Sequence, residues 1–160
     1  MMNDLVLDPG LSVLLAHSHV YVLRVYYEDT DSGKIVYHSN YLKFAERGRT
    51  EMLRLLGFDS TLLEKDYQLA PAVYSLDIKY LKPAALDDKL LVETFVEQVS
   101  GASMILKQKI MLIKGQVPIL DIANVNLKIV LLNKKGSLRR FPTNIKIAIN
   151  DLIIKESSKL

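Results

Sequence analysis

The chain has 160 residues, of which 49% are hydrophobic and 24% charged, and its formal net charge at pH 7 is +3. This length suits one domain with one hydrophobic core, and the composition is that of a globular protein rather than a disordered one. Because the chain has no cysteine, disulfides, thiolate nucleophiles and cysteine-based zinc sites are excluded. The three histidines (His17, His19 and His38) lack metal-ligand spacing, so we expect no metal site.

Residues 1–18 are expected to form a loosely ordered N-terminal extension, and residues 19–156 a single domain. The extension does not resemble an export signal, because it carries Asp4 and Asp8 in place of a basic region and a Pro-Gly pair breaks its apolar run. No segment reaches the roughly 18 consecutive apolar residues of a membrane-spanning helix. We therefore expect a cytoplasmic protein without a membrane span.

Hydrophobic periodicity predicts the elements that follow in the chain. Residues 20–27 are almost all aliphatic, aromatic or β-branched, which predicts a strand, and the polar residues 28–33 predict a loop. Over residues 41–56 the apolar side chains fall on one face of a helix, Ser39 or Asn40 stands where its N-cap belongs, and the glycine after it is a typical helix end. A second, shorter helix is predicted to follow Asp59 and to run to about Lys65.

The remaining segments predict antiparallel strands. Residues 73–81 alternate in polarity, segments 90–99 and 104–113 are joined by a Ser-Gly hairpin signal, and segment 119–132 follows a further turn. An apolar helix has to be covered by a sheet, so we expect an α+β fold in which a curved antiparallel sheet of about five strands wraps one long central helix. Apolar residues on the outer sheet face would favour a homodimer or homotetramer.

The polar loop is the strongest candidate for a functional site. Its acids, among them Asp31, are common in purely structural turns. The loop leads, however, to the start of the long helix, where free backbone N–H groups and the helix dipole suit a developing oxyanion. A carboxylate beside such groups can attack a carbonyl or activate water, which is acyl-transfer chemistry. Four tyrosines cluster around the same positions: Tyr26, Tyr27, Tyr37 and Tyr41.

Three stretches of the sequence are RVYYEDTD at 24–31, IVYHSNY at 35–41 and ERGRTE at 46–51. Together they resemble the hotdog-fold acyl-CoA thioesterases, within them the 4-hydroxybenzoyl-CoA thioesterase branch and its YbgC-like, Tol-Pal-associated subfamily. The resemblance is strong over residues 24–54 and continues more weakly to about Leu132. It implies a hotdog fold, an active site at a dimer interface, and a hydrolase that splits acyl-CoA or acyl-carrier thioesters into free acid and thiol.

The resemblance also implies residue roles. Asp31 corresponds to the catalytic aspartate, as nucleophile or general base, and the backbone N–H of His38 corresponds to the group that binds the thioester oxygen. The family usually has glycine where this chain has Lys34. No cofactor is implied beyond the coenzyme A of the substrate. Three side chains would line the substrate site: Tyr27, Thr30 and Tyr37.

Two further side chains each have two interpretations. The imidazole of His38 could hydrogen-bond Asp31 or transfer a proton, or it could cap and pack at the helix start. Glu46 lies three residues before Arg49, whose place on the apolar helix face calls for a charged partner, so the two would form an ion pair. Alternatively Glu46 faces the substrate, because a second branch of hotdog thioesterases carries its catalytic carboxylate on this helix; it is then the second candidate catalyst.

Two other functions stay open. A hotdog hydratase or dehydratase would act on thioester-bound acyl chains, but these enzymes rely on a histidine paired with an acid, whereas the matching position here is an aspartate. A non-catalytic acyl-CoA-binding scaffold at the cell envelope would share the fold. For the hydrolase we expect an acyl-CoA substrate, an acyl carrier protein as a second candidate carrier, and no nucleic acid.

Overall fold

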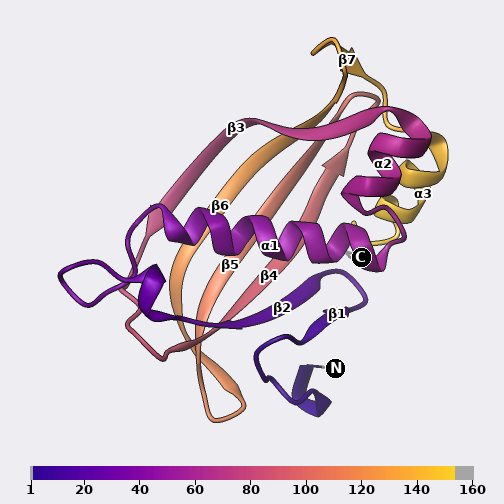
Figure 1. The fold of residues 1–160 in the computed structure, drawn as a ribbon. Coiled ribbons are helices and arrows are strands. Elements are labelled where there is room, and N and C mark those ends of the chain that lie inside the picture. Colours follow the sequence, from indigo (N-terminus) through magenta and orange to yellow (C-terminus); the bar gives the residue numbers. More distant parts are fainter. Residues whose placement is uncertain (1, 154–160) are drawn as a thin grey trace, which may run out of the picture.

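The structure is a computed structural model that describes residues 2–153. Its central element is one long helix, α1 (Asn40–Leu55), which lies across the curved face of an antiparallel sheet (Figure 1). The strand order is β1-β2-β4-β5-β6-β3, and the short β7 pairs with β6. The predicted α+β arrangement of a helix wrapped by a sheet is confirmed. The predicted domain end at residue 156 lies outside the described residues.

The sheet has seven strands where about five were expected. The five long strands correspond to the predicted ones, and the additional β1 and β7 have only three and two residues. Strands this short carry too few residues to show an alternating pattern. The strands are β1 (Ser12–Leu14), β2 (His19–Arg24), β3 (Leu69–Tyr80), β4 (Lys89–Val99), β5 (Ser103–Lys114), β6 (Val117–Asn133) and β7 (Leu138–Arg139).

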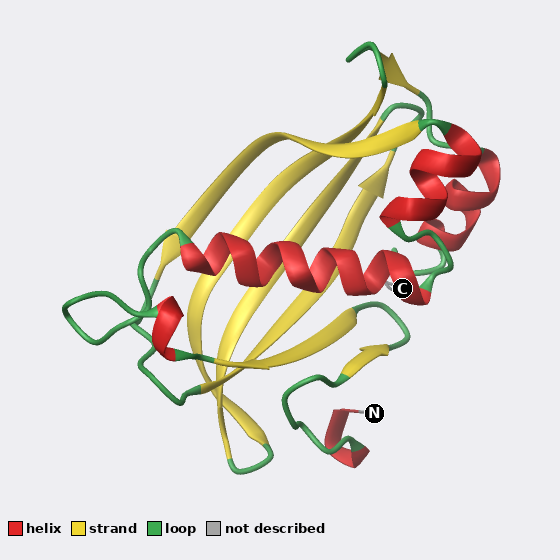
Figure 2. Cartoon of the chain, in the orientation of Figure 1, coloured by secondary structure: helices red, strands yellow, loops and turns green. Residues whose placement is uncertain are grey.

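The two predicted helices begin and end close to their predicted bounds. The residue before α1 is Ser39, and its side chain makes no capping hydrogen bond, while Gly57 follows the helix with a φ of +86°. The predicted capping role of Asp59 is confirmed, because its carboxylate accepts a hydrogen bond from the N–H of Leu62 in α2 (Ser60–Tyr67). Figure 2 shows α2 and α3 (Thr143–Asn150) together beside the C-terminal end of α1.

The core lies between α1 and the concave face of the sheet. The side chains of Phe44, Ala45 and Met52 are fully buried there. Gly48 marks the closest approach, since a Cβ at this position would lie 2.9 Å from Cγ1 of Val92 in β4. A side chain of any kind at position 48 would therefore hold the helix away from the strand.

The N-terminal segment packs against the opposite face of the sheet, so the prediction of a loosely ordered extension is wrong. Leu7 is only 1% exposed and clusters with Val20, Val22 and Leu91, which alternate with residues that face α1. Strand β1 pairs with β2, and Asp8 forms an ion pair with Lys89. The N-terminal segment thus covers the part of the outer sheet face that Val20, Val22 and Leu91 form. In the described part of the chain, no helix has the length and apolar character needed to cross a membrane.

Candidate active site

The loop that carries Asp31 is a tight hairpin. The N–H of Asp31 donates to the carbonyl of Ile35 at 3.0 Å, and the N–H of Lys34 donates to the carbonyl of Asp31 at 2.9 Å. An isolated bridge between Thr30 and Val36 continues the pairing. The Asp31 carboxylate is exposed, and its Oδ1 accepts a 2.7 Å hydrogen bond from the N–H of Gly33. The catalytic candidate is therefore held by its own loop, and within residues 2–153 its second oxygen accepts no hydrogen bond.

Gly33 and Lys34 each meet one steric requirement of this hairpin. Lys34 adopts a φ of +62°, the left-handed region that glycine occupies most readily, so the residue at the family's glycine position carries the strained conformation itself. Gly33 has a different role, because a Cβ there would lie 3.0 Å from Oδ1 of Asp31. The glycine of this chain leaves room for the carboxylate, and the lysine makes the turn.

The hairpin is fastened to the start of α1 through Asp29. This residue is 5% exposed, and its carboxylate accepts a hydrogen bond from the N–H of Tyr26 at 2.8 Å. Its carbonyl oxygen accepts two more, from the N–H of Tyr37 at 2.9 Å and from Nδ2 of Asn40 at 2.8 Å. The loop and the helix start are thereby held in one fixed arrangement.

The backbone at the start of α1 offers free donors. The N–H groups of Tyr37 and Asn40 are paired, but within residues 2–153 no acceptor is present for the N–H of His38 or Ser39. Unpaired N–H groups at this end of a helix combine with the positive end of its dipole. The arrangement suits an incoming carbonyl oxygen on which negative charge develops.

Aromatic rings surround the same backbone. The ring of Tyr37 lies 4.4 Å from that of His38, centroid to centroid, and Tyr80 of β3 reaches across to donate a 2.9 Å hydrogen bond from its hydroxyl to the carbonyl of His38. Tyr80 also packs edge-on against Tyr41, at 5.7 Å. Strand β3 thereby contributes one wall of the site, although it lies far from the loop in sequence.

The buried Tyr41 connects this wall to the core. Its hydroxyl accepts a 3.0 Å hydrogen bond from the N–H of Ala84. Burial raises the pKa of Tyr41 above its usual value, and the nearby negative charges of Asp88 and Asp31 act in the same direction, while the hydrogen bond from Ala84 lowers it. The phenol therefore stays protonated at neutral pH and acts as a neutral, fixed part of the site.

The structure brings together most of the predicted site residues. The hairpin and the segment after it carry Thr30, Asp31, Tyr37 and His38, and the hydroxyl of Thr30 donates to the carbonyl of Tyr27 at 2.9 Å. Tyr27 itself is 81% exposed in the single chain. Among the described contacts, no hydrogen bond joins the side chains of Asp31 and His38; the imidazole packs between tyrosine rings instead.

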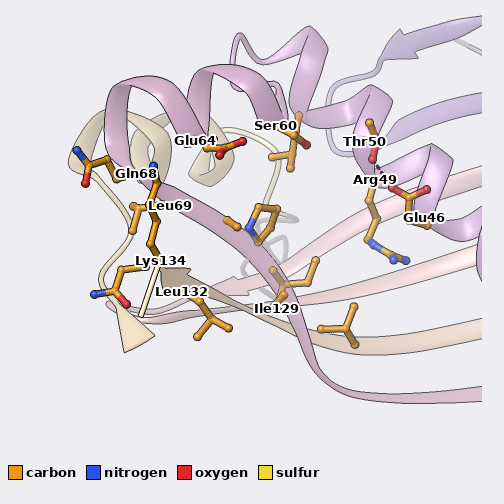
Figure 3. A pocket seen from close by; sticks show the side chains of 16 residues that line it. Glu46, Arg49, Thr50, Ser60, Glu64, Gln68, Leu69, Ile129, Leu132 and Lys134 are labelled. Carbon is orange, nitrogen blue, oxygen red and sulfur yellow. Dashed lines mark hydrogen bonds between the residues drawn. The ribbon is translucent and has the colours of Figure 1, made fainter. Parts of the chain in front are cut away.

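Glu46 lies elsewhere, at a cavity of about 420 Å³ between α1, α2, β3 and β6 (Figure 3). The expected ion pair with Arg49 is wrong. The Glu46 carboxylate accepts a 2.6 Å hydrogen bond from the hydroxyl of Thr50, whereas Arg49 donates at 2.9 Å to Oε1 of Gln108 in β5. The partner of Arg49 is thus the buried side-chain amide of Gln108 in the sheet, where the helix spacing predicted Glu46. No residue of the 31–35 hairpin lines this cavity.

The sequence patterns missed two positioning residues. Asp29 was grouped with the acidic turn, and Asn40 was one of two candidate helix caps. Only the folded loop shows that both are buried and bonded to each other. The only hint in the sequence is that Asp29 and Asn40, eleven positions apart, are polar residues on either side of a short apolar run.

Comparison with known proteins places the chain in a family. Residues 33–119 match the model of the thioesterase superfamily, 4HBT. An acyl-CoA thioesterase YbgC from Haemophilus influenzae is 42% identical over 139 residues, which are 87% of this chain and 99% of that protein. An acyl-CoA thioester hydrolase YbgC from Escherichia coli is 43% identical over 88 residues, which are 55% of this chain and 65% of that protein.

A solved structure agrees with these matches. A probable thioesterase from Bartonella henselae superposes with a TM-score of 0.72 at 34% identity, covering 78% of this chain and 99% of that one. The chain belongs to the thioesterase superfamily and has its hotdog fold, and it is an enzyme of the thioester-hydrolase class. Within the superfamily it groups with the YbgC-type proteins, as the sequence motifs predicted.

Proposed function

We propose that the protein hydrolyses acyl-CoA thioesters, with water adding across the C–S bond to release a free acid and the thiol of coenzyme A. Membership of the thioesterase superfamily supports the reaction, and two relatives carry acyl-CoA in their names. The observation that carries the assignment of Asp31 is its place in a rigid hairpin that leads directly to the unpaired N–H of His38 at the start of α1.

In the proposed mechanism the Asp31 carboxylate acts on the thioester carbonyl. It either attacks the carbonyl carbon, so that the C–S bond breaks, the coenzyme A thiolate leaves and a mixed anhydride remains for water to hydrolyse, or it removes a proton from the water that attacks the carbonyl carbon and displaces the thiolate. In both routes the carbonyl oxygen becomes negative, and the N–H of His38 together with the helix dipole stabilises that charge. Thr30, Tyr27 and Tyr37 would then contact the acyl group or the pantetheine arm.

A homodimer, or a homotetramer built from it, is part of the proposal. Strand β3 is an edge of the sheet, twelve residues long, and its Val73, Tyr74 and Tyr80 are exposed in the single chain. A long apolar edge strand of this kind is usually covered in a native protein. Light scattering after gel filtration would test this proposal: a mass of one chain for the wild-type protein contradicts it. Location in the cytoplasm stays a prediction.

A thiol-release assay with short, long and aromatic acyl-CoAs tests the function. We expect turnover by the wild-type protein and a loss of roughly 10²–10⁴-fold in kcat for Asp31→Asn. The matched control is Glu28→Gln, which removes an exposed acid from the same loop and should leave kcat within twofold. Absence of thiol release from every acyl-CoA tested would contradict the proposal.

The same assay separates the alternatives. A collapse in Glu46→Gln with normal turnover in Asp31→Asn would make Glu46 the catalyst. Hydration of a 2-enoyl-CoA without thiol release would indicate a hydratase, and binding without any turnover would indicate a scaffold. Acyl groups presented on an acyl carrier protein, compared with the same groups on coenzyme A, decide which carrier is preferred.

A further inference from the structure

We propose that Tyr80 is a positioning residue of the Asp31 site, whose hydroxyl holds the turn before α1 so that the N–H groups of His38 and Ser39 both face the thioester oxygen. The inference rests on the proposed function, because it gives Tyr80 a part in that reaction. Tyr80 is the last residue of β3 and lies 42 positions after His38, and Figure 1 shows this end of β3 beside the start of α1. Its hydroxyl donates a 2.9 Å hydrogen bond to the carbonyl oxygen of His38.

The carbonyl of His38 lacks the hydrogen bond that a regular helix would give it. A helical carbonyl accepts from the N–H four residues further on, which here belongs to Leu42. The N–H of Leu42 donates instead to the carbonyl of Ser39, at 3.2 Å. Within residues 2–153 the Tyr80 hydroxyl is then the only donor to the His38 carbonyl. A side chain from the sheet thus makes the hydrogen bond that the backbone leaves out.

The turn before α1 leaves two successive N–H groups free. The N–H of Asn40 donates to the carbonyl of Tyr37 at 2.8 Å, so His38 and Ser39 are the two central residues of a hydrogen-bonded turn. Ser39 has a φ of −73° and a ψ of −18°, which are helical values, and the N–H groups of a first helical turn point toward the same end of the helix. Both N–H groups are therefore available to one oxygen atom that approaches this end.

The hydrogen bond from Tyr80 acts on the peptide group that joins His38 to Ser39. The carbonyl of this group belongs to His38 and its N–H to Ser39, so a donor at the carbonyl fixes the plane in which the N–H lies. It also polarises the peptide group, which makes the N–H a stronger donor. Tyr80 therefore orients and strengthens one of the two groups that would stabilise the oxyanion.

Tyr80 is itself held in place from two sides. Its backbone pairs with Ala123 in β6, and its ring packs edge-on against the buried Tyr41, at 5.7 Å. Tyr80 is nevertheless 45% exposed and His38 is exposed, so water can satisfy the carbonyl when the hydroxyl is absent. We therefore expect loss of the hydroxyl to change the geometry of the turn more than the stability of the fold.

A thiol-release assay tests the role of Tyr80, with the acyl-CoA that the wild-type protein turns over fastest. Tyr80→Phe keeps the ring and loses the hydroxyl. We expect it to lower kcat about tenfold and to leave KM within about twofold, because the donor matters most when the carbonyl oxygen becomes negative. Tyr67→Phe is the matched control: it removes the hydrogen bond that another tyrosine hydroxyl accepts, from Asn144, and should leave kcat within about twofold.

Infrared spectra of the same acyl-CoA, labelled with carbon-13 at the thioester carbonyl, give a readout that a purely structural role would not change. Bound to the Asp31→Asn protein, the labelled carbonyl should absorb at a lower wavenumber than in solution, because hydrogen bonds from the two N–H groups weaken the C=O bond. In the double variant Asp31→Asn/Tyr80→Phe the band should move part of the way back to its position in solution.

Three results overturn the proposal: an unchanged kcat in Tyr80→Phe, a raised KM with an unchanged kcat, or a carbonyl band that does not move in the double variant. A loss of activity that appears only in Tyr80→Leu also overturns it, because the ring and not the hydroxyl would then be responsible. These results leave the proposed hydrolysis intact as long as the wild-type protein releases thiol. If the wild-type protein releases none, the proposed function fails and the role of Tyr80 fails with it.

Discussion

The side-chain amide of Asn40 donates a 2.8 Å hydrogen bond to the carbonyl oxygen of Asp29, and this bond joins the first residue of α1 to the loop that presents Asp31. Both residues are buried, at 7% and 5% exposure. The buried amide of Asn40 thus holds the loop of the proposed catalytic carboxylate next to the proposed oxyanion donor at the helix start.

Asn40→Ala should weaken both the fold and the site. The change leaves the Asp29 carbonyl with one donor fewer in a buried place, so we expect the free energy of unfolding to fall by about 1–3 kcal/mol. At a temperature where the variant is fully folded, kcat should still be lowered about tenfold or more, because the hairpin is no longer fixed. Urea unfolding and thiol-release kinetics measure the two effects.

The control for Asn40 is Ser39→Ala. Ser39 makes no capping hydrogen bond, so its loss should change the free energy of unfolding by less than about 0.5 kcal/mol. An unchanged kcat in folded Asn40→Ala would show that the Asp29 contact supports stability only.

The backbone conformation of the hairpin predicts that a glycine at position 34 stabilises the protein. Lys34 has a φ of +62°, so Lys34→Gly should raise the free energy of unfolding by about 1 kcal/mol. The same substitution at the exposed helical Lys43 should lower it by about 1 kcal/mol, because glycine disfavours helix. Chemical denaturation of both variants tests the pair, and a loss at both positions would contradict the strain at Lys34.

His19 predicts a pH dependence of stability. It is fully buried, its Nε2 lies 2.9 Å from the hydroxyl of Ser12, and burial lowers its pKa from 6.5 to about 4. Between these values the unfolded chain binds a proton that the folded one does not, so this contribution is complete above pH 6.5 and is lost as the pH falls to 4. The linked change is on the order of 3 kcal/mol.

Urea midpoints measured from pH 7.5 to pH 4 test the role of His19. His19→Phe should flatten the profile in this window, whereas His17→Gln, at an exposed histidine, should leave it unchanged. Identical profiles for the wild-type protein and His19→Phe would exclude His19 as the source.

The N-terminal segment should contribute to stability through Leu7. This side chain is 1% exposed, so Leu7→Ala should cost about 2–5 kcal/mol, while Val6→Ala, at a residue that is 66% exposed, should cost less than about 0.5 kcal/mol. Thermal or urea unfolding compares the two. Equal, small losses would mean that the segment does not pack on the sheet in solution.

The sequence predicted the elements whose patterns are long. Helix α1 and strands β3 to β6 have eleven or more residues each, enough for a helical or alternating period to emerge. The short strands β1 and β7 were missed for the opposite reason. The N-terminal segment was misjudged because its apolar residues gain a partner only once the convex face of the sheet exists.

The sequence pointed to the proposed catalytic groups and did not point to the residues that support them. Asp31 and His38 stand in a recognisable motif, but the contribution of Tyr80 depends on a strand that returns to the loop only in the folded sheet. Likewise, the three-residue spacing of Glu46 and Arg49 favoured an ion pair, and the partner that Arg49 uses comes from β5, 59 positions away. Spacing along one helix cannot predict a hydrogen-bond partner that comes from a distant strand.

The sheet topology also bears on how the protein folds. Strands β4, β5 and β6 follow one another through short turns, whereas β2 pairs with β4 only after α1, α2 and β3 have been accommodated between them. Contacts that close such long loops form slowly compared with hairpins. The Asp31 hairpin lies on the connection from β2 to α1, inside this late-closing loop. Enzymatic activity should therefore return last in refolding, after the central hairpins have already formed their hydrogen bonds.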